Sequence, residues 1–331
     1  MNAPVQPAQP YPMTFGQILD RVYRLMRAHC KLFIGIAALP AAAMILFVIL
    51  LLAAAFGPIL SQLPNPPDPA YIFHWIIPEM LLACPLMMAV SALYLAASIH
   101  AAIEADHGVT VTVRDAYEVA WKRAGRYLWL LFLAYMIALF PALAIEIAMF
   151  APMALFALGK TGSASVLVDL IPVEFLLYLA ALIYGVIMAL RLSLAFPASL
   201  SEDLTARAAI RRSGQLTQGA KGRIFLVLLV VYAFAYVAEM AGIVIMAMLI
   251  AFGVLIGVLF GVQMPSAVGI AGIVMAALCF FAFLFLWSAL VWAAFSTSFA
   301  VFYRDQKLRQ EGPPPAGASG SVSAGAGEGM A

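Results

Sequence analysis

The sequence predicts an all-α membrane protein with six transmembrane helices, and three observations lead to this fold class. First, 65% of the residues are hydrophobic and only 10% are charged, whereas an average soluble domain carries roughly 25% charged residues. Second, six apolar runs are long enough to cross a bilayer, because a helix of about 20 residues spans the hydrocarbon. Third, lysines and arginines gather in every second loop between these runs.

The apolar runs define one membrane domain, residues 13–309, between two polar ends. Residues 1–12 and 310–331 are rich in small residues, proline or glutamine, bury little apolar surface, and are therefore predicted to be disordered. The fifth run is so long that a break near Gly253 or Gly257 is an alternative to one continuous span. The six predicted spans are residues 32–56, 71–103, 127–158, 170–190, 224–262 and 267–303.

The basic residues predict the orientation of the spans. Of the 18 lysines and arginines, only Lys160 falls outside the segments that precede span one, follow span six, or join spans two to three and four to five. Positive residues near span ends resist translocation, so this side is predicted to be the cytoplasm. We therefore expect a multi-pass protein of the bacterial cytoplasmic (inner) membrane with both termini in the cytoplasm.

Three cytoplasmic segments, ahead of spans one, three and five, have the pattern of amphipathic helices. They begin at Thr14, Thr112 and Thr205 and continue with apolar residues three or four positions apart, opposite polar ones. Such helices are expected to lie at the membrane interface with their basic faces toward anionic headgroups. The side chains predicted to contact headgroups are Arg21, Arg24, Arg27, Lys122, Arg123, Arg126, Arg211 and Arg212.

The same three segments raise the possibility of an internal repeat. Thr112 follows Thr14 by 98 residues, and Thr205 follows Thr112 by 93, so a unit of helix, span and span would occur three times. The alternative is that any short cytoplasmic loop is basic and mildly amphipathic. The third segment favours this alternative, because its apolar face consists of small residues.

Carboxylates inside the apolar runs are the sharpest candidates for a functional site. Glu146, Glu174 and Glu239 lie roughly 22 to 28 Å from the cytoplasmic ends of their helices, at about 1.5 Å per residue. A charge at mid-span costs on the order of 2.5 to 3.5 kcal/mol on insertion scales, so each needs a reason. They would either face one polar cavity that binds a cation or relays protons, or fix helix packing near the outer interface.

The sequence contains no pattern typical of an enzyme, a metal site or a nucleic-acid-binding protein. Cys30, Cys84 and Cys279 are scattered through apolar stretches, and the histidines form no HxxxH or HExxH pattern. Phosphate-binding glycine loops and nucleophile motifs are also missing. We therefore expect no catalytic residue, cofactor or metal.

The loop after the fourth span resembles a known family. The residues that carry the resemblance are Pro197, Glu202, Ala208, Ser213, Leu216 and Gly219, together with the opening TFGQILDRVYRLMRAHCKLF. This pattern is similar to that of a bacterial integral-membrane family named after the membrane domain attached to some glycerophosphodiester phosphodiesterases. The family often has an aromatic residue after the serine, whereas this chain has Gly214.

The resemblance implies a fold and a membrane location but little activity, because the hydrolase chemistry of such proteins belongs to a separate soluble domain. No stretch outside the spans approaches the size of such a domain. From the residues themselves, Pro197 is predicted to end the fourth span and Glu202 to cap a helix or pair with Arg211 or Arg212. Gly219 is predicted to release the chain before the fifth span.

The leading hypothesis is a non-enzymatic membrane protein that binds anionic lipid, and a protein partner, through its basic face. The alternative is a small-solute or cation transporter that uses the intramembrane glutamates.

Overall fold

The computed structural model describes residues 11–61, 69–157, 164–259 and 267–312, which contain helices and no strands. Each long helix has a window that is long and apolar enough to cross a bilayer, so the chain is a multi-pass membrane protein. The long helices are α2 (Cys30–Ser61), α3 (Pro69–Asp106), α5 (Ala124–Ala157), α6 (Ala164–Leu192), α9 (Lys221–Leu259) and α10 (Ala267–Glu311). The short helices are α1 (Phe15–Ala28), α4 (Val113–Lys122), α7 (Ala195–Ser201) and α8 (Ala206–Leu216).

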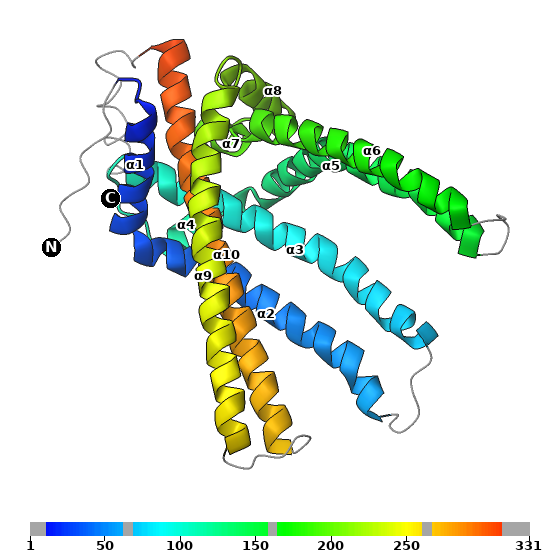
Figure 1. Cartoon of the computed structure of the whole chain (residues 1–331). Coiled ribbons are helices and arrows are strands. Elements are labelled where there is room, and N and C mark those ends of the chain that lie inside the picture. Colours follow the sequence, from blue (N-terminus) through cyan, green and yellow to red (C-terminus); the bar gives the residue numbers. More distant parts are fainter. Residues whose placement is uncertain (1–10, 62–68, 158–163, 260–266, 313–331) are drawn as a thin grey trace.

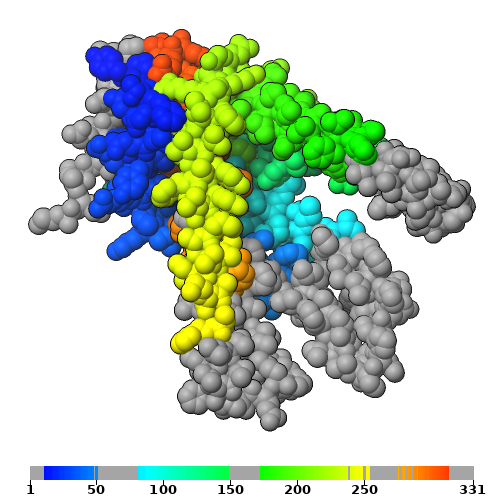
Figure 2. Space-filling model, viewed as in Figure 1, coloured from blue at the N-terminus to red at the C-terminus, as the bar shows by residue number. Residues whose placement is uncertain are grey.

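The long helices form three hairpins, α2–α3, α5–α6 and α9–α10, which diverge from one end of the molecule (Figure 1). Helix α10 packs along both α2 and α3, so the first and third hairpins share an interface. The second hairpin is joined to the others mainly at the end where the short helices lie, and its α6 extends away from α9 (Figure 2). The protein therefore has one compact end and three apolar arms.

Helix α9 is continuous from Lys221 to Leu259 and passes through Gly253 and Gly257 without interruption. The alternative of a break at these glycines is therefore wrong. Residues 260–262 of the same predicted span lie outside the described residues, as do 1–10 and 313–331 of the ends predicted to be disordered. Helix α10 continues through Gln310 and Glu311, which the sequence pattern assigned to the tail.

The three threonines singled out in the sequence are the N-caps of short helices. Thr14 caps α1 and Thr112 caps α4, each in a capping box in which the threonine and the third helical residue bond to each other's backbone N–H. Thr205 occupies the N-cap of α8 in the same extended conformation, without a side-chain bond. The order of short helix, long helix, long helix thus occurs three times, and α7 is an addition between the second and third units.

The apolar face of α1 packs on the protein. Ile18, Val22 and Leu25 are buried in a cluster with residues of α8, α9 and α10, among them Leu216, Ile224 and Phe302. The compact end is therefore a tertiary core, here called the basic end: α1, α4, α7, α8 and the adjoining ends of the long helices. Met13 also belongs to it, and its backbone N–H donates to Asp305 Oδ1 at 2.7 Å. Both ends of the described chain thus lie together, as an even number of spans requires.

Candidate functional site at the basic end

A buried aspartate ends the first hairpin. Asp106, the last residue of α3, is 3% exposed and receives Arg21 Nε at 2.7 Å. Arg21 Nη2 also donates to the backbone carbonyl of Asp106 at 3.0 Å, and Arg304 of α10 pairs with the second carboxylate oxygen. Because an unpaired buried charge is strongly destabilising, both arginines hold α3 to α1 and to α10.

A second buried aspartate, Asp305, lies near the end of α10. Its fully buried carboxylate accepts Arg223 Nη1 at 3.0 Å, Arg309 Nε at 2.9 Å and the Met13 N–H. The carbonyl oxygen of Met13 accepts from Arg309 at 2.8 Å and from Arg223. These bonds join the start of the described chain, the first turn of α9 and the last turns of α10 around one carboxylate.

A third aspartate occupies the corresponding place in the second unit but is more exposed. Asp203 follows α7 with φ 51°, the left-handed conformation that non-glycine residues rarely adopt, and its carboxylate accepts Arg123 and Arg126. In each unit, then, an arginine near the start reaches the aspartate at the end. The aspartates are 97 residues apart from Asp106 to Asp203 and 102 apart from Asp203 to Asp305, similar to the spacing of the threonines. This regular spacing of aspartates is visible in the sequence, but the sequence-based prediction did not use it.

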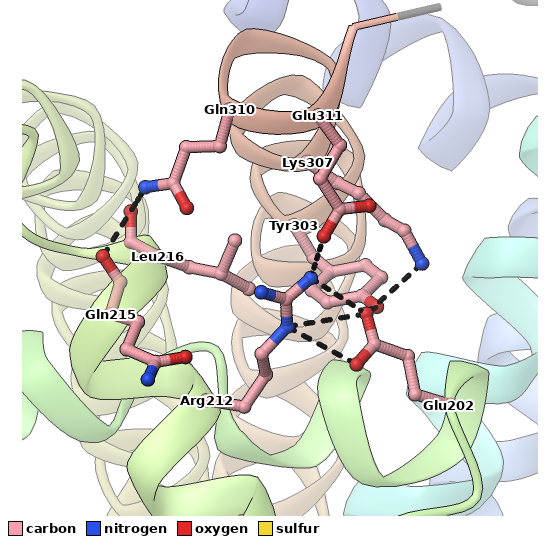
Figure 3. A network of polar contacts seen from close by, with 8 residues as sticks. All are labelled: Glu202, Arg212, Gln215, Leu216, Tyr303, Lys307, Gln310 and Glu311. Carbon is pink, nitrogen blue, oxygen red and sulfur yellow. Dashed lines mark hydrogen bonds and ion pairs between the residues drawn. The ribbon is translucent and has the colours of Figure 1, made fainter. Parts of the chain in front are cut away.

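Glu202 is the centre of a polar network between α7, α8 and α10 (Figure 3). Its carboxylate accepts the Tyr303 hydroxyl at 2.6 Å, Lys307 Nζ at 3.0 Å and Arg212 Nε at 3.1 Å. Burial alone would raise the pKa of Glu202, but the hydrogen bonds from Tyr303, Arg212 and Lys307 outweigh it and lower the pKa to about 2. The predicted pairing of Glu202 with Arg211 or Arg212 is therefore confirmed for Arg212.

The same network fixes the end of α10. Arg212 also pairs with Glu311, and Gln310 Nε2 donates to the backbone carbonyls of Gln215 and Leu216 at 3.2 and 3.3 Å (Figure 3). These acceptors are carbonyl groups of the last turn of α8, which lack the N–H partner four residues on that a helix interior provides. The bonds explain why α10 remains helical to Glu311.

Pro197 does not end the fourth span. Helix α6 ends at Leu192, and Pro197 lies in the first turn of α7, where a missing backbone N–H leaves no helical hydrogen bond unmade. Ser213 closes the end of α6 instead. Its buried hydroxyl donates to the Arg191 carbonyl at 2.6 Å and accepts the Leu194 N–H at 3.2 Å.

The remaining residues of the motif have structural places in and after α8. Leu216 is fully buried, Ala208 is half-buried, and Gly219 turns the chain toward α9 with φ +75°. The last is a conformation that favours glycine. Gly214 lies beneath the Arg191 guanidinium, since a Cβ added there would be 3.1 Å from Arg191 Nε. Glycine at position 214 thus leaves room for the Arg191 side chain.

The eight basic residues predicted to contact headgroups have different environments. Arg21, Arg126 and Arg212 are largely buried and form the internal ion pairs described above. Arg123 pairs with Asp203, whereas Arg24 and Lys122 are exposed and pair within their own helices with Asp20 and Glu118. Arg27 and Arg211 are exposed and form no ion pair with the part of the chain that the structure describes.

Two of the three intramembrane glutamates come together. Glu146 of α5 and Glu174 of α6 both lie close enough to Tyr178 of α6 to act on it electrostatically. Glu239 lies half-buried on α9. Among the described residues, no three acidic, histidine or cysteine side chains are grouped as a metal ion would require, so Glu239 does not complete a three-glutamate cluster of that kind.

Comparison with protein-family models, with curated proteins and with solved structures finds no match.

Proposed function

We propose that this chain is a non-enzymatic protein of the bacterial cytoplasmic membrane whose basic end lies in the cytoplasm and binds anionic lipid headgroups. One observation carries the proposal: after the internal ion pairs are made, a set of exposed cations remains at that end with no ion pair to the described residues. These cations are Arg27, Lys31, Arg114, Arg191, Arg207, Arg211 and Lys221.

The physical basis is that each lysine or arginine near an anionic membrane surface contributes about 1 kcal/mol of attraction. Here the cations project from helices that buried ion pairs hold in place, so they would meet the headgroups without first becoming ordered. The same face would receive a cytoplasmic protein partner.

A structural role for the carboxylates of the basic end supports the non-enzymatic part of the proposal. Asp106, Asp305 and Glu202 are each engaged by two or more cationic side chains. A general base, in contrast, needs a free lone pair directed at a substrate.

Lipid binding is tested with the full-length protein in a non-ionic detergent. We expect mass spectrometry of the intact complex to detect more retained phosphatidylglycerol than phosphatidylcholine when both are supplied equally. The preference should weaken as salt is raised, because salt screens exposed charges. Equal retention of the two lipids at low salt would contradict the proposal.

Orientation is tested with reporters fused after Gly312 in a bacterial host. A fluorescent protein that folds only in the cytoplasm should fluoresce, whereas alkaline phosphatase, which is active only outside, should be inactive. The reverse pattern would place the basic end on the outer side.

A second candidate function, transport of a cation or small solute, is favoured by the approach of both Glu146 and Glu174 to Tyr178. These residues lie in the apolar windows of α5 and α6, and ionisable groups at that depth commonly mark ion or substrate pathways. In proteoliposomes, Glu146→Gln should abolish proton or cation flux, whereas Glu239→Gln on α9 is the matched control. Flux equal to that of protein-free vesicles for the wild-type protein would exclude this candidate.

A further inference from the structure

One side of α8 carries a row of arginines. Arg207, Arg211 and Gly214 are spaced by four and three residues, so their Cβ directions lie within about 60° of one another around the helix. The Gly214 position is covered by Arg191 from the end of α6, whose Nε and Nη2 atoms would lie 3.1 and 3.6 Å from a Cβ there. Three guanidinium groups therefore follow one side of α8 over about 10 Å.

The row is exposed and held in place. Arg191, Arg207 and Arg211 are exposed and form no ion pair with the described residues, whereas the neighbouring Arg212 points toward Glu202. The Ser213 hydroxyl bonds to the Arg191 carbonyl and thereby fixes the end of α6 against α8. A side chain larger than that of Gly214 would displace the Arg191 guanidinium from the row.

An apolar helix face starts directly beside this row. Ile187 and Ile183 lie one and two turns before Arg191 on the same side of α6, and they are 44% and 55% exposed. Leu179 precedes Ile183 at the same spacing of four residues, in a row that slants around α6 by about 40° per step. All three side chains are at least 44% exposed, so neighbouring helices do not cover this apolar row.

We propose that the junction of α6 and α8 binds one anionic phospholipid specifically. Its phosphodiester is held by Arg191, Arg207 and Arg211, and its acyl chains lie along Ile187, Ile183 and Leu179. Guanidinium groups suit this ligand because one guanidinium group can donate two parallel hydrogen bonds to two oxygens of the same phosphate. The apolar face favours a lipid over a soluble phosphate, since only a lipid uses both features. The inference rests on the proposed function and deepens it.

The test compares two sets of charge-neutralising substitutions in the full-length protein. One set is Arg191→Gln, Arg207→Gln and Arg211→Gln, and the matched control is Arg27→Gln, Lys31→Gln and Arg114→Gln, which removes the same charge from exposed positions on α1, α2 and α4. Bound phosphatidylglycerol is counted by mass spectrometry of the intact complex. Both sets should weaken retention, because both remove exposed cations of the basic end, but we expect the first set to weaken it at least tenfold more than the control set.

The outcomes separate this inference from the proposed function. Equal losses in both sets would overturn the specific site and leave a diffuse basic surface, whereas no lipid preference in the wild-type protein would overturn both. Displacement of the lipid by millimolar inorganic phosphate would also overturn the lipid site, because the acyl chains would then contribute nothing. Arg207→Gln alone is the variant to use if the triple variant does not fold, because Arg207 lies at an exposed position on α8. It should weaken lipid retention severalfold, and unchanged retention would contradict the specific lipid site.

Gly214→Leu is an independent test that keeps every charge. The larger side chain should move Arg191 and weaken retention severalfold, while the control Gly16→Leu, where an added Cβ would meet nothing within 4 Å, should not. Unchanged retention in a folded Gly214→Leu protein would remove Arg191 from the site.

Discussion

The basic end and the apolar arms of this protein are held together by different means. At the basic end, ion pairs and hydrogen bonds join residues far apart in the sequence, for example Arg21 of α1 to Asp106 of α3 and Arg223 of α9 to Asp305 of α10. Along the arms, many large apolar side chains are exposed, such as Phe140, Phe175 and Phe234, and would face lipid. The comparison shows that the polar contacts that fix how the helices pack are concentrated at the basic end. Along the arms, the surroundings of the apolar side chains would be supplied by the bilayer.

The largest expected effect comes from removing a buried charge at the basic end. Asp305→Asn would leave Arg223 and Arg309 without their carboxylate, and breaking a buried ion pair typically costs about 3–5 kcal/mol. Unfolding of the purified protein in mixed micelles should detect this loss. A cost near that of an exposed substitution would mean that the ion pairs do not hold this end together.

A second prediction compares a glycine in each region. A Cβ at Gly35 would lie 2.6 Å from Cγ2 of Val113, a stiff β-branched side chain, so Gly35→Ala should destabilise the basic end by about 1–3 kcal/mol. In the arms, a Cβ at Gly242 would lie 2.7 Å from the ring tip of Phe283, which can move into lipid. Gly242→Ala should therefore cost less. The reverse order in thermal unfolding would contradict the contrast between the two regions.

The third prediction concerns pH. The pKa of Glu202 is lowered to about 2, so its contribution to stability is fully present above its unfolded value of roughly 4.3 and is lost as the pH falls toward 2. We expect about 1 kcal/mol from this partly exposed group, because solvent screens it. Glu202→Gln should flatten the pH dependence of unfolding between pH 5 and pH 2.5, by roughly that amount. An unchanged profile would argue against the network around Arg212.

The smallest effect is expected for an exposed pair at the same end. Lys122 and Glu118 pair within α4 at 2.9 Å, with both side chains more than half exposed, and such pairs contribute less than about 0.5 kcal/mol. Glu118→Gln is therefore the matched control for Asp305→Asn. A large loss here would show that exposure is a poor guide to which ion pairs matter.

The candidate site could be predicted only in part from the sequence. The pairing of Glu202 with Arg212 was within reach because ten residues separate them along one short segment. Arg21 and Arg126 were predicted to face lipid, yet both side chains are largely buried against aspartates 85 and 77 residues away. A helical pattern identifies a polar face but does not distinguish a headgroup from a distant carboxylate as its partner.

The sequence by itself determined the six apolar helices, the gathering of the basic residues at one end, and the threonine N-caps, because hydrophobic length and capping are local properties. Only the tertiary structure decided which cations form ion pairs within the protein and which remain exposed without such a pair. The reason is distance along the chain: Met13 and Asp305 bond across 292 residues, and no local pattern encodes which chain segments meet. The same holds for Arg191 and Gly214, whose contact places three arginines in one row.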